Sequence, residues 1–496
     1  MATFTPRPAA LQERPRSLIE VELDAAQRLA VEQPAGSPML VLGEAGHGKT
    51  TVALHRLAHL YRSAAPGTRF RAVVIVPHEG LVRLLLPLVT RLGVDVPVET
   101  YEHWARRQAR RAFADIPRRE SVAVAEGVLR IKRDPWLREL LRELAQLPPG
   151  VIDDDADAPP PETEAHAQRG DLQHLFGDGD RMQRLADRSG LPARAVAAVL
   201  EHTHVQFLPR SEVSHAHVDA ERLVTLDRRS LDAETPAENA ASIDTEDYAV
   251  LFELDRMRAK LRGARPTRPL RYDCIVVDEA QEFAALELAL LGRSLANDGT
   301  LVVAGDADQQ TDATSGFRSW RATMRALYAP RYREVVLEVG YRCPPNVVEF
   351  ARPLRQNALP APSVPLLRCA DEGGLNDWLL GEAVALAESD ERASFCIIAR
   401  KRGVAARIFA ALRGKVACKL VLDGEFVFHR GADVTVVDQV KGAGVRLRGG
   451  RRRDGGELPG HGREPQSAVR RRDANAVSAG AGGGGRGEPA VERVWA

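Results

Sequence analysis

Residues 43–50 read GEAGHGKT and follow directly on a short apolar run, MLVLG, at residues 39–43. They fit the pattern G-x-x-x-x-G-K-[ST], and a helical pattern continues from Thr50 to about Arg62. Glycines let backbone N–H groups turn towards a phosphate, and a helix that begins there presents its positive end to the same anion. This strand–loop–helix context therefore predicts a phosphate-binding loop.

The side chains of this loop have separate expected roles. Lys49 is expected to reach the β- and γ-phosphates of ATP, and Thr50 is expected to ligate Mg²⁺ through its hydroxyl. A chance glycine-rich turn is the alternative, and the flanking strand and helix patterns disfavour it. The residues predicted to bind ATP from this loop are Gly43, Gly46, Gly48, Lys49, Thr50 and Thr51.

A second apolar run, CIVV at residues 274–277, ends in two adjacent carboxylates, Asp278 and Glu279. Asp278 is expected to hold the Mg²⁺, and Glu279 to orient and deprotonate the attacking water. Neighbouring residues of a strand point to opposite sides, so the pair can act together only where the strand ends and the chain turns. A solvated acidic strand end is the alternative, and the phosphate-binding pattern makes the catalytic pair the better interpretation.

Apolar strand-like runs alternate with helical patterns over much of the chain, which predicts an α/β fold with parallel sheets. The strand-like runs lie at residues 39–43, 71–77, 272–277, 300–304, 395–399 and 433–437. Between them, residues 105–265 show helical periodicity and one Pro/Asp-rich break at residues 148–164. We interpret this part as a helical insertion with a flexible acidic loop.

Composition limits the partners. The 496 residues carry a net charge of only +1, so nucleic acid would have to bind in a local basic groove. The five cysteines include no C-x-x-C pair, which argues against a zinc site and fits a reducing cytoplasm. No apolar run approaches the ~18 residues of a membrane-spanning helix, so we expect no membrane and a cytoplasmic location.

The residues Asp278-Glu279-Ala280-Gln281 resemble the DExQ box of the UvrD/Rep-type superfamily 1 helicases. This family has two RecA-like domains of the P-loop NTPase fold, which bind ATP between them and move along single-stranded DNA. Further segments resemble family motifs in the family's order. They are Leu23–Arg28 (the Q motif), Thr100–Trp104 (a single-strand contact), Gly305–Gln309 (GDxxQ), Phe317–Arg318, Gly340–Arg342 (NYR) and Val440–Gly442 (the start of KGLEFD).

The resemblance implies a role for each matching residue. Gln27 would read the adenine, Gln309 would sense the γ-phosphate, Tyr341 would stack on the adenine, and Arg342 would reach the γ-phosphate. Phe317 would stack on a base of the bound strand. Trp104 is a second candidate for stacking, and a core position is the open alternative for it.

The resemblance also divides the chain. The expected parts are a flexible N-terminus (1–16), a first RecA-like motor domain (17–104 plus 266–345), the helical insertion (105–265), an incomplete second RecA-like domain (346–442) and a tail (443–496). The implied function is that of an ATP-dependent DNA helicase or translocase. Residues 48–56 are also similar to the HelD branch, so the alternative is an ATPase that remodels RNA polymerase. A second alternative is an inactive ATP-binding remnant.

The tail carries a separate prediction, that residues from about Ala443 are translated out of frame. Deleting one G at codon 443 yields codons that admit Leu-Glu-Phe-Asp-Tyr-Val, which would complete the KGLEFD box after Lys441 and Gly442. The same shift at residues 468–476 admits Leu-Tyr-Val-Ala-Val-Thr-Arg-Thr-Arg, which resembles the family's LYVAxTRA box. The chain as written would then lack both boxes, and its Gly/Arg-rich tail is expected to be disordered.

Overall fold

The computed structural model describes residues 23–44, 46–65, 69–113, 116–122, 124–147, 164–214, 217–218, 232, 235–340, 349–350, 353, 366–389, 394–422, 431–440 and 492–495. The N-terminal residues 1–16, Tyr341, Arg342 and nearly all of the tail therefore lie outside the described residues. Among the described helices, none has the length and apolar character needed to cross a bilayer.

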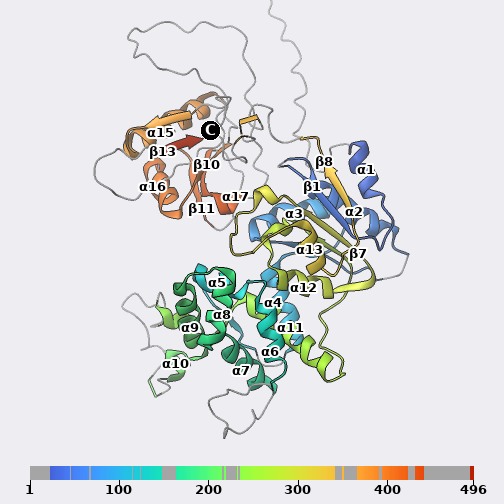
Figure 1. Cartoon of the computed structure of the whole chain (residues 1–496). Helices are drawn as coiled ribbons and strands as arrows, with labels where there is room; N and C mark the ends of the chain where they lie inside the picture. Colours follow the sequence, from blue (N-terminus) through green and yellow to red (C-terminus); the bar gives the residue numbers. More distant parts are fainter. Residues whose placement is uncertain are drawn as a thin grey trace, which may run out of the picture.

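The protein has an α/β fold with a sheet of six parallel strands flanked by helices (Figure 1). Every neighbouring pair in this sheet is parallel. In spatial order the strands are β3 (Val98–Thr100), β2 (Ala72–Val76), β6 (Tyr272–Val277), β7 (Leu295–Gly305), β1 (Met39–Gly43) and β8 (Arg333–Leu337). The helices that follow or flank these strands are α1 (Ala25–Val31), α2 (Lys49–Ser63), α3 (Glu79–Arg91), α4 (Tyr101–Ala112), α12 (Ala285–Arg293) and α13 (Trp320–Ala326).

The central strands carry apolar runs because both faces of the sheet are covered. On β1, Leu40 belongs to one core, whereas Met39 and Val41 belong to the other. On β2, Val73 and Val74 divide in the same way. Side chains of a strand alternate between its two faces, so a run without polar residues is what a sheet buried on both faces requires.

The described residues between 105 and 265 are mostly helical, as predicted. The helices are α5 (Glu126–Lys132), α6 (Leu137–Leu144), α7 (Glu164–Phe176), α8 (Gly179–Ser189), α9 (Ala193–Phe207), α10 (Ser211–Ser214) and α11 (Thr245–Leu261), with the short 3-10 helix η2 (Pro236–Asn239). Two short strands, β4 (Arg119–Glu120) and β5 (Ser242–Ile243), pair in parallel. The predicted boundary at residues 104–105 falls inside α4, and one continuous core joins these helices to a face of the sheet.

A second, three-stranded parallel sheet has the order β10 (Ser394–Ala399), β12 (Gly431–Val436), β11 (Cys418–Val421). Helices α15 (Glu372–Ser389) and α16 (Arg402–Leu412) contribute to its separate core, and the short helix α17 (Val437–Val440) follows β12. In the tail, β13 (Glu492–Trp495) pairs antiparallel with β9 (Leu366–Cys369). This strand is a difference from the expectation that the tail is wholly disordered.

Candidate functional site

The loop at residues 43–50 connects β1 to α2, and its glycines occupy conformations that other residues rarely adopt. Gly46 and Gly48 have φ angles of 82° and 88°, in the left-handed region. A Cβ at Gly48 would lie 2.8 Å from the Gln27 side-chain nitrogen, and a Cβ at Gly43 would lie 2.9 Å from the Leu337 carbonyl oxygen. Backbone conformation therefore favours glycine at residues 46 and 48, and the space beside the Leu337 carbonyl requires it at residue 43.

Lys49 and Thr50 form the first turn of α2, directly after this loop. Lys49 Nζ donates to the carbonyl oxygens of Gly43, at 2.9 Å, and Glu44, at 3.2 Å. The same ammonium lies 3.9 Å from a carboxylate oxygen of Asp306. The ammonium is thus held inside the curve of the loop, where a phosphate would bind.

The acidic strand end lies beside this loop because β6 and β1 are separated in the sheet only by β7. Thr50 Oγ1 donates to Asp278 Oδ2 at 2.8 Å, which joins two motifs that are 228 residues apart in the sequence. Burial and the neighbouring Glu279 raise the pKa of Asp278 to about 7, against the opposing effects of Thr50 and Lys49. Buried carboxylates that repel each other favour a bound cation.

Glu279 is held in a strained backbone conformation, with a φ of 52°. A non-glycine residue in this region is uncommon, and such outliers cluster at functional sites. This left-handed conformation turns the chain sharply after β6 and leads it into the 3-10 helix η3 (Ala280–Glu282). A turn at this point is what the sequence analysis expected if the two carboxylates act together. The Glu279 carboxylate is also held by a hydrogen bond, because Gln281 Nε2 donates to Glu279 Oε2 at 2.6 Å.

The GDADQ segment lies at the end of β7, next to this turn. Asp306 N donates to Gln281 Oε1 at 3.2 Å, and Gln309, in the 3-10 helix η4 (Ala307–Gln309), donates its side-chain N–H to Asp306. A Cβ at Gly305 would lie 2.3 Å from the Trp320 ring, so only glycine allows this close packing. Gln309 is therefore connected to Glu279 through Asp306 and Gln281.

Gln27 approaches the loop from the other side. It is buried, forms a capping box with Asp24 at the start of α1, and donates to the His47 carbonyl oxygen at 3.3 Å. His47 Nδ1 is 2.6 Å from the Leu337 carbonyl oxygen, which ties the loop to β8. Gln27 is thus adjacent to the loop, and its role in reading adenine stays a prediction.

The two nucleic-acid candidates differ. The Phe317 ring is half-buried and packs edge-on against Trp320, with the ring centroids 4.9 Å apart. Trp104 is fully buried and donates its indole N–H to the Tyr272 hydroxyl at 3.2 Å. The proposal of Trp104 as a stacking residue is therefore corrected, because its ring has no face open to a base. The core position is the correct alternative.

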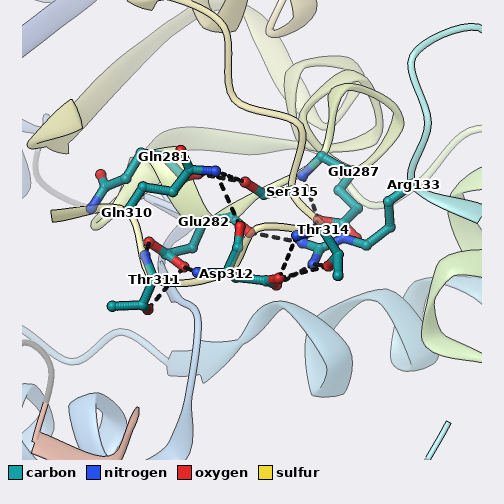
Figure 2. Close-up of polar contacts among 10 residues, drawn as sticks. Arg133, Gln281, Glu282, Glu287, Gln310, Thr311, Asp312, Thr314 and Ser315 are labelled. Atoms are coloured by element: carbon teal, nitrogen blue, oxygen red, sulfur yellow. Dashed lines mark hydrogen bonds and ion pairs between the residues drawn. The ribbon is translucent and has the colours of Figure 1, made fainter. Parts of the chain in front are cut away.

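A polar network that the sequence did not reveal surrounds Arg133, the residue that follows α5. Its guanidinium donates to the Glu282 carbonyl oxygen at 2.7 Å, to Thr314 Oγ1 at 2.7 Å and to Glu287 Oε2 at 3.0 Å, and it pairs with Asp312. Although burial opposes the charge, Glu287 and Asp312 raise the pKa of Arg133. Figure 2 shows Arg133 between Glu287 and the loop that contains Asp312 and Thr314.

The same network continues to the acidic turn (Figure 2). Ser315 Oγ donates to the Gln281 carbonyl oxygen at 2.9 Å, and Gln310 Nε2 donates to Ser315 Oγ at 2.8 Å. Glu282 accepts the backbone N–H groups of Thr311 and Asp312 at 3.0 and 2.9 Å. Local sequence offers no signal for these contacts, because Arg133 lies 149 residues from Glu282 and 179 from Asp312.

The residues at the loop fit ATP and Mg²⁺ in chemical terms. Within the described residues, no group of three or more His, Cys, Asp or Glu side chains could hold a metal alone. Mg²⁺ typically binds one or two carboxylates together with substrate phosphates and water, so Asp278 and Thr50 are a fitting protein contribution. The buried, mutually repelling Asp278 and Glu279 also favour a cation there.

Comparison with known proteins adds no further assignment. No protein-family model matches this chain, and no curated protein matches it by sequence.

Proposed function

We propose that this chain is an ATP-binding motor protein of the UvrD/Rep helicase type, with the loop at residues 43–50 as its P-loop. The observation that carries the proposal is the hydrogen bond of 2.8 Å between Thr50 and Asp278. It brings together the two groups that a P-loop ATPase needs for its metal, from motifs identified independently in the sequence. In this proposal, the six-stranded sheet belongs to a RecA-like domain, and the three-stranded sheet belongs to a second, incomplete one.

The residues around the acidic turn suggest how hydrolysis would occur. Glu279 accepts a proton from water, the water oxygen attacks the γ-phosphorus, and the bond to the β–γ bridging oxygen breaks to leave ADP. Gln281 holds the Glu279 carboxylate through its hydrogen bond of 2.6 Å, so the base is oriented before ATP arrives. Bound Mg²⁺, held by Thr50 and Asp278, would neutralise phosphate charge.

Coupling to nucleic acid would run through the GDADQ segment. Gln309 connects through Asp306 and Gln281 to Glu279, and the same stretch of chain continues to Phe317. A change at the γ-phosphate would therefore be transmitted along one short segment to a stacking residue. Single-stranded nucleic acid typically binds through such aromatic contacts in a basic groove.

The chain as written would be a weak enzyme. The proposed second domain lacks the KGLEFD and LYVAxTRA boxes, and the latter supplies an arginine to the ATP. Such an arginine contributes about 10³–10⁵ in rate. ATP binding is therefore the activity we expect most directly, with slow turnover. The inactive remnant is the limiting case of this proposal, in which binding occurs without turnover.

The experiment that tests the proposal measures binding of a fluorescent ATP analogue, and then ATP hydrolysis with and without single-stranded DNA. We expect Mg²⁺-dependent nucleotide binding and stimulation of the residual hydrolysis by DNA. Hydrolysis that responds to RNA polymerase but not to DNA would favour the HelD-like alternative. A chain that binds no nucleotide would contradict the proposal.

A further inference from the structure

A recess of about 360 Å³ lies between the start of α6 and the helices α12 and α13. Three arginines line it: Arg138 from α6, and Arg321 and Arg325 from α13. The remaining lining residues include alanines, a leucine and a serine, and none of them is acidic. A volume of this size is at the lower end of the range for ligand pockets. The positive charge of the lining arginines suits an anionic ligand.

The two arginines on α13 are available to a ligand. Arg321 and Arg325 are four residues apart, so they lie on one face of the helix, and both are exposed. The Arg138 guanidinium already has two partners, because it donates to Glu253 Oε1 at 2.7 Å and to the Tyr328 hydroxyl at 3.0 Å. Glu253 also accepts two hydrogen bonds from Arg256, so it is already shared between two guanidinium groups.

The network around Arg133, which Figure 2 shows, involves residues next in sequence to the lining of the recess. Arg133 lies two residues before Pro135, which lines the recess, and its partner Glu287 lies next to Leu286, which also lines it. The Arg133 side chain is only 9% exposed, and its ion pairs connect the turn between α5 and α6 to Glu287 on α12 and to Asp312 in the loop before α13. The recess is therefore built from elements whose spacing is set by buried contacts.

Aromatic and basic side chains continue from both walls. Phe317 and Arg318 directly precede Ser319, which lines the recess, and Trp136 directly follows Pro135. The Arg318 guanidinium lies 5.8 Å from the Trp136 ring centroid and the Arg188 guanidinium lies 3.6 Å from it, so Trp136 already stacks with cations and the base position remains at Phe317. Alternating aromatic rings and guanidinium groups suit a single strand, whose bases stack and whose phosphates pair with cations.

We propose that this recess is a phosphate-binding subsite for single-stranded nucleic acid, in which Arg321 and Arg325 contact backbone phosphates next to the base on Phe317. This inference rests on the proposed function, because it extends the path of the same strand. It places one side of that path on the helical region, through Arg138 and Trp136. Strand binding would therefore bridge the sheet and the helical region.

The test measures binding of a fluorescently labelled oligothymidylate over a range of salt concentrations, for the parent and for Arg321→Ala/Arg325→Ala. We expect the affinity to fall about tenfold at low salt, because two phosphate contacts are lost. The slope of log K against log salt should fall in magnitude by about 1.4, at ~0.7 for each single-strand phosphate contact. A control with the same charge change, Arg194→Ala/Arg402→Ala, replaces exposed arginines on α9 and α16 and should keep the parental slope.

A lysine pair, Arg321→Lys/Arg325→Lys, keeps both charges and should keep most of the slope. An unchanged slope in the alanine pair, with a parent that binds, would overturn the subsite and leave the proposed function standing. A lysine pair that loses as much as the alanine pair would also overturn it, because phosphate pairing requires mainly the charge. A parent that does not bind the strand at all would overturn both the subsite and the nucleic-acid part of the proposed function.

Discussion

In the six-stranded sheet, the neighbouring strands β6, β7 and β1 are followed by polar residues that contact one another. After β1, Thr50 contacts Asp278 at the end of β6, and Lys49 pairs with Asp306 at the end of β7. Gln281 connects the two pairs, because it contacts both Glu279 and Asp306. In the three-stranded sheet, β12 ends at Val436 and leads into α17, and residues 441–491 then lie outside the described part of the chain. The polar groups predicted after that point lie outside the described residues.

Within the described residues, the six-stranded sheet is the one that brings such polar groups together. Parallel strands end at the same edge, so three adjacent strands can place three polar groups within contact distance. In the six-stranded sheet, the polar groups at the strand ends come from motifs that lie between Gly43 and Gln309. The second sheet has the strands, but the boxes that should follow them are the ones the predicted frame error removes. The predictions below test each side of this contrast.

Correcting the reading frame should have the strongest effect on activity. Deletion of one G at codon 443 should restore the KGLEFD and LYVAxTRA boxes after β12, and with them an arginine that acts on the ATP. We expect ATP hydrolysis to rise by about 10³–10⁵. Sequencing of the DNA around codons 441–445 and an ATPase assay of the corrected chain check this. If sequencing confirms the present reading frame and the deletion does not raise ATP hydrolysis, the predicted frame error is refuted.

The first sheet shares its core with the helical region, and Lys132 tests that connection. Its buried ammonium contacts Asp244 at 2.6 Å and Asp247 at 2.8 Å. Although burial disfavours the ammonium, these carboxylates raise the pKa of Lys132. Lys132→Met leaves Asp244 and Asp247 buried without the ammonium that neutralises them. We therefore expect a loss of about 3–5 kcal/mol in the free energy of unfolding.

Hydrogen exchange distinguishes the two units in that variant. Protection should fall in the helical region and in strands of the six-stranded sheet, and not in residues 394–422 of the second sheet. Lys260→Met, an exposed lysine on α11, should change little. Equal loss of protection in both sheets would mean that they unfold as one unit, against their separate cores.

Phe317→Ala tests whether nucleic acid binds on the side of the first sheet. Stacking on an aromatic ring is worth ~1–3 kcal/mol per base, so affinity for single-stranded DNA should fall about tenfold. Phe409→Ala, a half-buried phenylalanine on α16 of the second unit, is the matched control for loss of a ring. Anisotropy titrations measure both variants. An unchanged affinity for Phe317→Ala would assign this ring to the packing against Trp320 alone.

Glu246, near the Arg133 network, should make a pH-dependent contribution to stability. Burial and Glu287 raise the pKa of Glu246 to about 8, against the attraction of Arg133. The folded carboxyl thus holds its proton more tightly than the unfolded one, so the contribution is present below the unfolded pKa. It is lost as pH rises towards 8.

Replacement by glutamine removes this effect. The Tm of Glu246→Gln relative to the parent should therefore be higher at pH 9 than at pH 5, in thermal melts at both values. Glu201→Gln, at an exposed position on α9, should show no such difference. A Glu246→Gln difference that is the same at both pH values would show that the carboxyl does not change its ionisation in this range.

Much of this arrangement was predictable from local sequence. Apolar runs located β1, β2, β6, β7, β10 and β12, because strands of a covered parallel sheet carry runs of apolar residues. The glycine pattern at residues 43–50 predicted a tightly turned loop, and Gly46 and Gly48 adopt left-handed conformations there. The pairing of Thr50 with Asp278 followed from motif knowledge, since no local pattern links residues so far apart.

The rest depended on tertiary packing. Trp104 lies in an amphipathic helix, and sequence alone left open whether its face was buried or exposed; its contact with Tyr272 decides this. β3 has only three residues and β8 is a partly exposed edge strand, so neither shows a full apolar run. Arg133 resembles the many other arginines of its region, and only the fold brings Glu282, Glu287 and Asp312 around it.

A paired comparison of Lys49→Ala and Glu279→Gln tests the assignment of the first sheet most directly. Nucleotide binding and single-turnover hydrolysis would be measured for both variants beside the parent, in the frame-corrected chain if the parent turns over too slowly. We expect Lys49→Ala to lose ATP binding, because the ammonium inside the loop is removed. Glu279→Gln should bind ATP as the parent does and not hydrolyse it. Hydrolysis by Glu279→Gln at the parental rate, or undiminished ATP binding by Lys49→Ala, would contradict the assignment of this site.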